Sequence, residues 1–293
     1  MKIIVIGKSG QLAWEISKLS GEDAEILCLG REEINITDKA SLLNQLSQQN
    51  VSAIINASAY TAVDKAETDS QAAYNINTHA VENLALVCKE LSIHLVHVST
   101  DFVFDGNNSS PYLPLDHKDP IGVYGKSKSD GEDLINQVIP NDSCIIRTSW
   151  VYSSHGNNFV KTMLKLMNSK PELGIISDQI GTPTYAKGLA QVCLYAAINK
   201  VKGIQHWTDT GVASWYDFAV AIQELALEKG LLHKAIPIKP IRTADYPTPA
   251  KRPSYSVLDK TSIETAFPEL SLVHWRTQLS LMMNDLKIND EHN

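Results

Sequence analysis

The sequence predicts an α/β protein with a Rossmann-type, doubly wound parallel sheet and a smaller C-terminal substrate-binding part. Two observations support this fold class. Short continuous apolar runs alternate with longer segments of helical spacing through the first half of the chain, which is typical of βαβ units whose strands are buried on both faces. A glycine-containing loop directly follows the first apolar run, as in doubly wound sheets that bind nucleotides. At 293 residues the chain is long enough for this arrangement.

In the first half, each strand is expected from a compact run rich in β-branched and other apolar residues. The expected strands are Lys2–Ile6, Glu25–Leu29, Ala53–Asn56, His94–Ser99 and Ser143–Thr148. The segments between them carry apolar residues at helical spacing. The expected helices are Gln11–Leu19, a stretch after Asp38, Ser70–Leu91 and Gly125–Val138.

In the second half, apolar runs and helical segments alternate less regularly, and proline-rich connections separate the helical patterns. Helices are expected near Asn158–Met167, Tyr185–Ile198, Ser214–Lys229 and His274–Leu286. The connection Pro237–Pro253 holds five of the twelve prolines. We therefore predict a dinucleotide-binding domain over residues 1–150. Residues 151–293 are expected to be mainly a substrate-binding part packed on the carboxyl edge of the sheet.

Composition narrows the possible partners. The formal net charge is −7, with no basic stripe, so we expect no nucleic-acid partner. No apolar run is long enough for a membrane span or a signal peptide, which predicts a cytoplasmic protein with no membrane partner. The four cysteines are far apart and the histidines lack zinc-site spacing, so neither a disulfide framework nor a metal site is expected.

The loop after the first strand has the pattern GxxGxxA. Gly7 and Gly10 allow a sharp turn and a close approach of the backbone to a pyrophosphate. Gln11 and Leu12 open the following helix, whose free N–H groups favour an anion. A tight turn without a ligand would also need glycine, so this loop predicts dinucleotide binding only together with other features.

The end of the second strand bears on the choice of cofactor. Arg31 suits the 2′-phosphate of NADPH because a guanidinium matches phosphate geometry. Glu32 and Glu33 instead suit the ribose 2′-hydroxyl of NADH. NADPH or NADH is therefore expected, with NADPH favoured.

Tyr124 and Lys128 are four residues apart at the start of a predicted helix, so they share one face. Reduction of a carbonyl needs a proton donor at the developing alkoxide, and a neighbouring ammonium is expected to lower the pKa of the tyrosine. Thr100 follows the strand His94–Ser99 at the carboxyl edge of the sheet, where it can reach both the substrate carbonyl and the tyrosine. These residues predict a carbonyl reductase.

Together these segments resemble the dTDP-4-dehydrorhamnose reductase family of the extended short-chain dehydrogenase/reductase superfamily. The resemblance covers nearly the whole chain, with the segments in the family's order. The most specific segments are Ala59–Glu67 and Thr100–Gly106, which read AYTAVDKAE and TDFVFDG. The remaining segments are Gly7–Ala13, Tyr124–Lys128, Arg147–Tyr152 and Lys251–Pro253.

The resemblance implies reduction of the C4 keto group of dTDP-4-dehydro-L-rhamnose to dTDP-L-rhamnose, for lipopolysaccharide or another cell-surface polysaccharide. Tyr124 is then the proton donor, and Lys128 binds the ribose and tunes the tyrosine. The implied cofactor contacts are Gly10, Gln11 and Leu12 at the pyrophosphate, Asn35 and Ile36 at the adenine, and Ala59, Tyr60 and Thr61. The implied substrate contacts are Thr100, Asp101, Trp150 and Arg252.

Several alternatives stay open at this point. Some family members use Mg²⁺ at a homodimer contact through glutamates, and the sequence assigns neither the ligands nor the dimer. A relative of this fold is a non-catalytic regulatory subunit of methionine adenosyltransferase, although the intact Thr100, Tyr124 and Lys128 argue against that role. Other sugar-nucleotide epimerases and dehydratases share the glycine loop and the Tyr–Lys pair.

Overall fold

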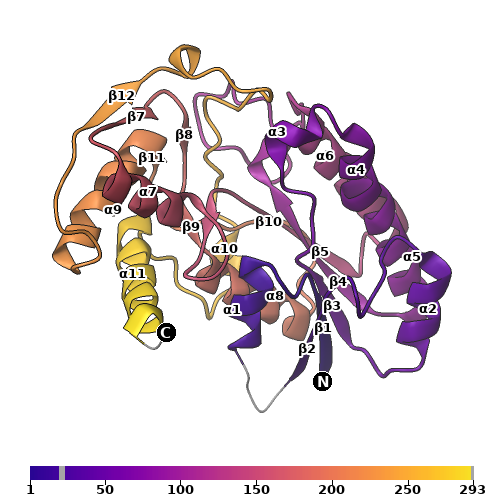
Figure 1. Cartoon of the computed structure of the whole chain (residues 1–293). Helices are drawn as coiled ribbons and strands as arrows, with labels where there is room; N and C mark the ends of the chain where they lie inside the picture. Colours follow the sequence, from indigo (N-terminus) through magenta and orange to yellow (C-terminus); the bar gives the residue numbers. More distant parts are fainter. Residues whose placement is uncertain (20–23, 292–293) are drawn as a thin grey trace.

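The computed structural model describes residues 1–19 and 24–291, so the last two residues of the predicted substrate-binding part lie outside it. Its centre is a six-stranded sheet in the order β10-β5-β4-β3-β1-β2, in which every pair is parallel (Figure 1). The strand order reverses between β1 and β3, where doubly wound sheets bind ligands. The strands are β1 (Lys2–Ile6), β2 (Glu25–Leu29), β3 (Ala53–Asn56), β4 (His94–Thr100), β5 (Ser143–Thr148) and β10 (Gly203–His206).

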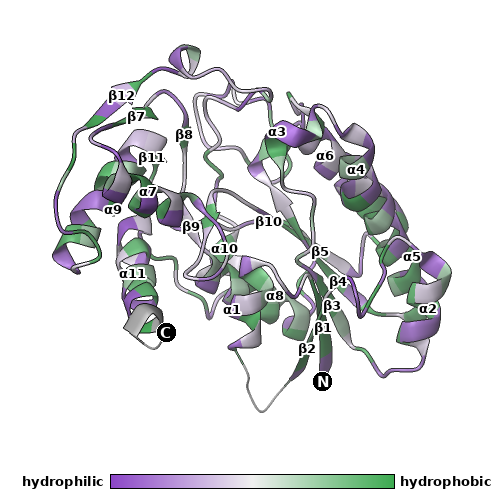
Figure 2. Ribbon diagram, in the orientation of Figure 1, coloured by the Kyte–Doolittle hydropathy of each residue, from purple (hydrophilic) through white to green (hydrophobic). Residues whose placement is uncertain are grey.

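Helices cover both faces of the sheet, which confirms the predicted fold class. Helices α1 (Gln11–Ser17) and α8 (Ala186–Asn199) pack on one face. The opposite face is covered by α2 (Lys39–Ser47), α5 (Ala80–Leu91) and α6 (Val123–Val138). Figure 2 shows the apolar colour concentrated in the strands between these layers. Apolar residues bury both strand faces, and this explains why the strand runs are continuous rather than alternating.

The segment predicted as one helix over Ser70–Leu91 is helical throughout but contains a wider turn. It consists of α4 (Ser70–Tyr74), a π-helical turn (Asn75–His79) and α5. Within the π-helical turn, the Asn77 amide accepts from the Tyr60 N–H (2.9 Å) and donates to the Tyr60 carbonyl (3.1 Å). Turns of this kind recur at functional sites, and this one holds the loop that follows β3.

The rest of the second half forms its own core beside the sheet. Its main helices are α7 (Phe159–Ser169), α9 (Trp215–Glu228) and α11 (Trp275–Glu291). Side chains cap two of these helices: Asn158 accepts from Lys161 N, and Ser214 and Asp217 form a capping box. The short strands pair as β6 (Val151–Tyr152) with β9 (Thr184–Tyr185), β7 (Leu173–Ile176) with β12 (Ile238–Ile241), and β8 (Ile180–Gly181) with β11 (Ala213–Ser214). The short helices are α3 (Val63–Ala66) and α10 (Ile263–Ala266).

Part of the second half returns to the sheet. Strand β10 pairs with β5, and α8 packs against α1. The chain therefore passes more than once between the sheet and the C-terminal core, and the division at residue 150 stays a prediction. None of the described helices combines the length and the apolar character needed to cross a bilayer.

Candidate active site

The ends of neighbouring strands bring the predicted site residues to one edge of the sheet. Ile6 pairs with Asn56, Asn56 with His97, and Thr100 with Thr148. The loops that follow β1, β3, β4 and β5 therefore leave from the same carboxyl edge. This edge is where parallel α/β sheets place their ligands.

The glycine loop after β1 has the conformation that a close backbone approach requires. Gly7 has a φ of 113°, and a Cβ atom there would lie 3.0 Å from the backbone of Ala57 and Ser58. Its N–H donates to the Leu29 carbonyl (2.9 Å), and Gly10 N donates to the Gly7 carbonyl (2.8 Å). A side chain at residue 7 would be strained and would strike the β3 loop, so this position requires glycine.

Two residues that follow the loop are already engaged by the protein. The Gln11 side-chain oxygen Oε1 accepts from Asn158 Nδ2 (2.9 Å), which ties the loop to the start of α7. The Leu12 side chain is buried in the core between α1 and the sheet, so only its backbone could face a ligand. The structure thus places both residues beside the loop, as predicted, and their contacts with a cofactor stay a prediction.

The residues predicted near the adenine and the 2′-position lie after β2. Arg31 and Asn35 are exposed, whereas Ile36 is buried. The Asn35 amide oxygen accepts from the Thr37 hydroxyl (2.7 Å), which shapes the turn. Glu33 accepts from Gly30 N (2.7 Å) and pairs with Lys8 from the glycine loop. Lys8 and Arg31 are both exposed cations beside the end of this strand, and Lys8 is paired with Glu33.

The loop after β3 borders the same edge. Ala59 and Tyr60 are half-buried and Thr61 is exposed. The Asn77 side chain bonds to both the N–H and the carbonyl of Tyr60, and it also donates to Ser127 Oγ (3.0 Å). This contact links the loop to α6, which carries the predicted catalytic pair. Asn77 was missed from the sequence, because an asparagine within a helical pattern gives no signal of its distant partner.

Helix α6 presents Tyr124 toward the end of β4. The helix starts after Gly122, where Glu67 accepts from the Val123 N–H (2.9 Å). The Tyr124 ring packs edge-on against Phe102 at 5.5 Å between centroids. Burial raises the pKa of Tyr124 to about 12, while a hydrogen bond with Thr100 opposes that rise and the Asp101 charge adds to it. Thr100 therefore acts on the pKa of Tyr124, and a joint role of the two residues in catalysis stays a prediction.

Thr100 and Asp101 form a buried polar end to β4. The Thr100 hydroxyl donates to Asp101 Oδ1 (3.0 Å) and accepts from Phe102 N (3.2 Å). Burial raises the pKa of Asp101 to about 6, and hydrogen bonds with Ser256 and Thr100 limit that rise. The Asp101 carboxyl therefore holds its proton to a higher pH than an ordinary aspartic acid does.

Lys128 lies one helical turn beyond Tyr124 and is buried, with only 1% of the residue exposed. Its Nζ donates to the Val98 carbonyl (2.7 Å) and lies 3.1 Å from His97 Nε2. Burial lowers the pKa of Lys128 to about 8, and Glu132 partly offsets this. The expected lowering of the tyrosine pKa by Lys128 does not occur in this structure: the pKa of Tyr124 rises, because burial outweighs its polar contacts.

A buried ion pair between Arg147 and Glu132 joins strand β5 to helix α6. Arg147 on β5 donates to both oxygens of Glu132, at 3.0 Å and 2.7 Å, and to the Pro114 carbonyl (3.0 Å). Lys118 also approaches Glu132 at 3.4 Å. Burial raises the pKa of Glu132, but the larger combined effect of these cations holds it below its usual value. The pair fixes the helix that carries Tyr124 and Lys128 to the sheet.

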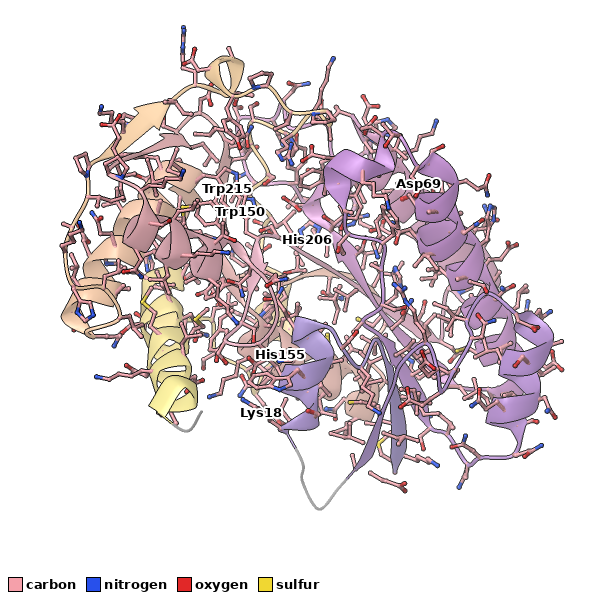
Figure 3. All side chains as sticks on the ribbon, in the orientation of Figure 1. Lys18, Asp69, Trp150, His155, His206 and Trp215 are labelled. Atoms are coloured by element: carbon pink, nitrogen blue, oxygen red, sulfur yellow. The ribbon has the colours of Figure 1, made fainter. Side chains whose placement is uncertain are left out.

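Trp150 follows β5 with a left-handed φ of 48°. Its ring stacks on Trp215 of α9, with 3.5 Å between centroids and 8° between planes (Figure 3). A Cβ atom on Gly181 would lie 2.7 Å from the Trp150 ring, so the stack also needs that glycine. The two rings form one stacked aromatic surface. Contact of Trp150 with a substrate stays a prediction.

Arg252 lies in the proline-rich connection and is held by a carboxylate. It donates to Asp64 through Nη1 (3.0 Å) and Nη2 (2.8 Å), and through Nη1 to Thr248 Oγ1 (2.7 Å). Asp64 belongs to α3, within the family-specific run after β3. The sequence did not predict this partner, which lies 188 residues away. No group of three or more His, Cys, Asp or Glu residues within residues 1–19 and 24–291 could hold a metal ion.

Comparison with known proteins identifies the family. The family described as the RmlD substrate binding domain matches residues 1–288. A dTDP-4-dehydrorhamnose reductase of Aggregatibacter actinomycetemcomitans is 41% identical over 274 residues, which is 91% of this chain and 93% of that protein.

Solved structures agree with this match. A dTDP-4-dehydrorhamnose reductase, an RfbD ortholog from Clostridium acetobutylicum, superposes with a TM-score of 0.92 at 37% identity and covers 98% of this chain and 100% of that one. The dTDP-4-dehydrorhamnose reductase of Bacillus anthracis, solved in complex with NADP, gives a TM-score of 0.90 at 30% identity, with coverage of 97% and 99%. The chain therefore belongs to the RmlD family of dTDP-4-dehydrorhamnose reductases.

Proposed function

We propose that this protein reduces the C4 keto group of dTDP-4-dehydro-L-rhamnose to give dTDP-L-rhamnose, with NADPH or NADH as the reductant. The observation that carries the proposal is the position of Tyr124 on α6, with its ring against Phe102 just after β4 and one helical turn from the buried Lys128. This is the arrangement that a carbonyl reduction needs, because the developing alkoxide must receive a proton.

The residues around the glycine loop fit a dinucleotide. Gly7 has a positive φ and no room for a Cβ atom, so its backbone can approach a pyrophosphate closely. The adjacent loop after β3 begins with the small residues Ala57, Ser58 and Ala59. The bound nicotinamide would supply the hydride, and Arg31 would favour a 2′-phosphate. The relative from Bacillus anthracis, solved with NADP, supports this assignment.

The protein's own groups would then handle the proton. Tyr124 would donate its phenol proton to the C4 oxygen as the alkoxide forms, and the Thr100 hydroxyl would hold that oxygen in place. Burial keeps Tyr124 protonated, since it raises the pKa of the phenol to about 12. Lys128, as an ammonium in the loaded enzyme, would stabilise the tyrosinate that remains.

The sugar nucleotide would lie between the sheet edge and the C-terminal core. Asp101 would contact the sugar, the Trp150–Trp215 stack would line its far side, and Arg252 would face the diphosphate. Both substrates, a nucleotide sugar and a reduced dinucleotide, favour the cytoplasm as the compartment.

The test is an assay of the purified protein with dTDP-4-dehydro-L-rhamnose, in which the absorbance loss of NADPH and of NADH is followed separately. We expect stoichiometric oxidation of the cofactor and formation of dTDP-L-rhamnose. A reaction without net cofactor oxidation would indicate an epimerase instead. Failure to turn over the dTDP-sugar, with turnover of another keto-sugar nucleotide, would overturn the proposed substrate.

A further inference from the structure

The buried ring of His97 sits between Asn56 and the predicted catalytic lysine. His97 is fully buried in the middle of β4, and strand register places it beside Asn56 on β3. Its Nδ1 lies 3.1 Å from Asn56 Nδ2, and its Nε2 lies 3.1 Å from Lys128 Nζ. Each ring nitrogen thus faces one nitrogen of a neighbour.

The orientation of the Asn56 amide is set by a group that can only donate. The backbone N–H of Ser58 points at Asn56 Oδ1 (3.2 Å), and the Ser58 hydroxyl donates to the same oxygen (2.6 Å). Because a backbone N–H cannot accept, this atom of Asn56 must be the oxygen. The atom that faces His97 is therefore the NH₂ group, which only donates.

This orientation decides where the proton of the imidazole lies. Nδ1 receives a hydrogen bond from Asn56 and so carries no proton. Burial holds the pKa of His97 well below its usual value, so the ring is neutral and keeps one proton. That proton must be on Nε2, where it points at Lys128 Nζ.

Lys128 can accept a hydrogen bond from this N–H group only if its nitrogen has a lone pair. An ammonium has three N–H groups and no acceptor, so it would face the Nε2–H donor against donor. A neutral amine can accept from His97 and still donate to the Val98 carbonyl at 2.7 Å. We propose that His97, fixed in its Nε2–H form by Asn56, is a positioning residue that favours the neutral amine of Lys128 over the ammonium in the unliganded enzyme.

The charged surroundings of Lys128 agree with this state. Glu132 is the carboxylate on the same helix that raises the pKa of Lys128, but Arg147 from β5 and Lys118 already engage it. Tyr124 is protonated, since burial raises its pKa to about 12. Burial lowers the pKa of Lys128 itself to about 8, so the neutral amine is accessible near physiological pH.

The inference builds on the proposed reductase for its kinetic consequence only. The value of kcat/KM reports ionisations of the free enzyme, so a requirement for the ammonium would make it fall above a pH of about 8. In His97→Gln, an amide oxygen can turn toward Lys128 and accept from an ammonium. We expect the fall in kcat/KM to move upward by about one pH unit in that variant.

A matched control comes from the same strand. His94 is also buried, at the start of β4, and within the described residues no hydrogen bond joins it to Lys128. His94→Gln makes the same chemical change and should leave the pH profile in place. A profile that moves equally in both variants, or in neither, would overturn the proposal.

A second measurement needs neither a variant nor a substrate. Nitrogen-15 NMR of the free protein should show the His97 ring protonated at Nε2 and unprotonated at Nδ1, without titration between pH 6 and 9. An Nδ1–H ring, or one that titrates in this range, would overturn the proposal. The ring state does not depend on which sugar the enzyme uses, so a failed reductase assay beside the expected spectrum would refute the function alone.

Discussion

Arg252 and Asp64 are joined by two parallel hydrogen bonds, of 3.0 Å and 2.8 Å, between the proline-rich connection and helix α3. Asp64 also accepts from the Ala250 N–H (3.2 Å), so one carboxylate holds both the backbone and the side chain of that connection. The Arg252 guanidinium holds the pKa of Asp64 below its usual range. The family-specific run after β3 thus fixes the arginine that is predicted to face the diphosphate.

Replacing Asp64 by Asn should weaken substrate binding and change the stability of the fold only slightly. The pair is partly exposed, so its loss should change the free energy of unfolding by about 1 kcal/mol or less. The KM for the sugar nucleotide should rise by about tenfold, the equivalent of one charge-assisted hydrogen bond, with kcat nearly unchanged. Asp245→Asn, which breaks the exposed Arg242 pair, is the control and should change neither value. An unchanged KM in Asp64→Asn would remove Arg252 from the diphosphate site.

Replacing Tyr124 by Phe should abolish proton donation and leave the fold intact. We expect kcat to fall by about 10²- to 10⁴-fold, the usual contribution of a positioned acid, with cofactor affinity retained. The matched control is Tyr195→Phe, the same chemical change on α8, where the ring packs on Phe267. Steady-state kinetics and fluorescence titration of NADPH measure the two effects. Full activity in Tyr124→Phe would show that another group supplies the proton.

The strands and the Tyr–Lys spacing could be predicted from the sequence because both depend on local pattern. Parallel strands are buried on both faces, so each one is a continuous apolar run, and the expected strands match β1, β2, β3 and β5 at both ends. Spacing of four residues puts Tyr124 and Lys128 on one helix face wherever the helix lies. The wider turn at Asn75–His79 left no such pattern, because it is set by contacts across the fold.

Contacts between distant segments could not be predicted in this way. The approach of Asn56 to His97 depends on the register of β3 against β4, which no single strand specifies. The partner of Arg252 lies 188 residues away, so its spacing carries no signal. The sequence predicts that the pKa of Tyr124 falls, because it shows the neighbouring lysine but not the desolvation of the phenol in the fold.

Adding a methyl group at Gly125 should displace helix α6, which carries the predicted catalytic pair. A Cβ atom there would lie 2.1 Å from the Phe102 carbonyl oxygen, so α6 must move away from the end of β4. Gly125→Ala should cost about 1–3 kcal/mol of stability and lower kcat, because Tyr124 and Thr100 separate. At Gly188 in α8 the nearest atoms lie at 3.6 Å, so Gly188→Ala is the control and should stabilise by about 0.5–1 kcal/mol. Chemical denaturation and kinetics of both variants check this, and equal effects would contradict it.

Replacing Asp209 by Asn should change the dependence of stability on pH. Asp209 is buried and accepts from the Tyr185 N–H (3.0 Å), and burial raises its pKa from 3.8 to about 7. The folded protein therefore keeps a proton that the unfolded chain releases above pH 3.8, so this group's contribution to stability is lost as the pH rises toward 7. An asparagine cannot ionise and still offers an oxygen to Tyr185.

The gain in Tm of Asp209→Asn over the wild type should thus be larger at pH 8 than at pH 5, as thermal unfolding at the two values would show. Asp64→Asn is the control, since the pKa of Asp64 lies below its usual range and its carboxyl is charged in both states across this window. A Tm difference for Asp209→Asn that stays constant from pH 5 to pH 8 would mean that the buried carboxyl ionises as it does in the unfolded chain.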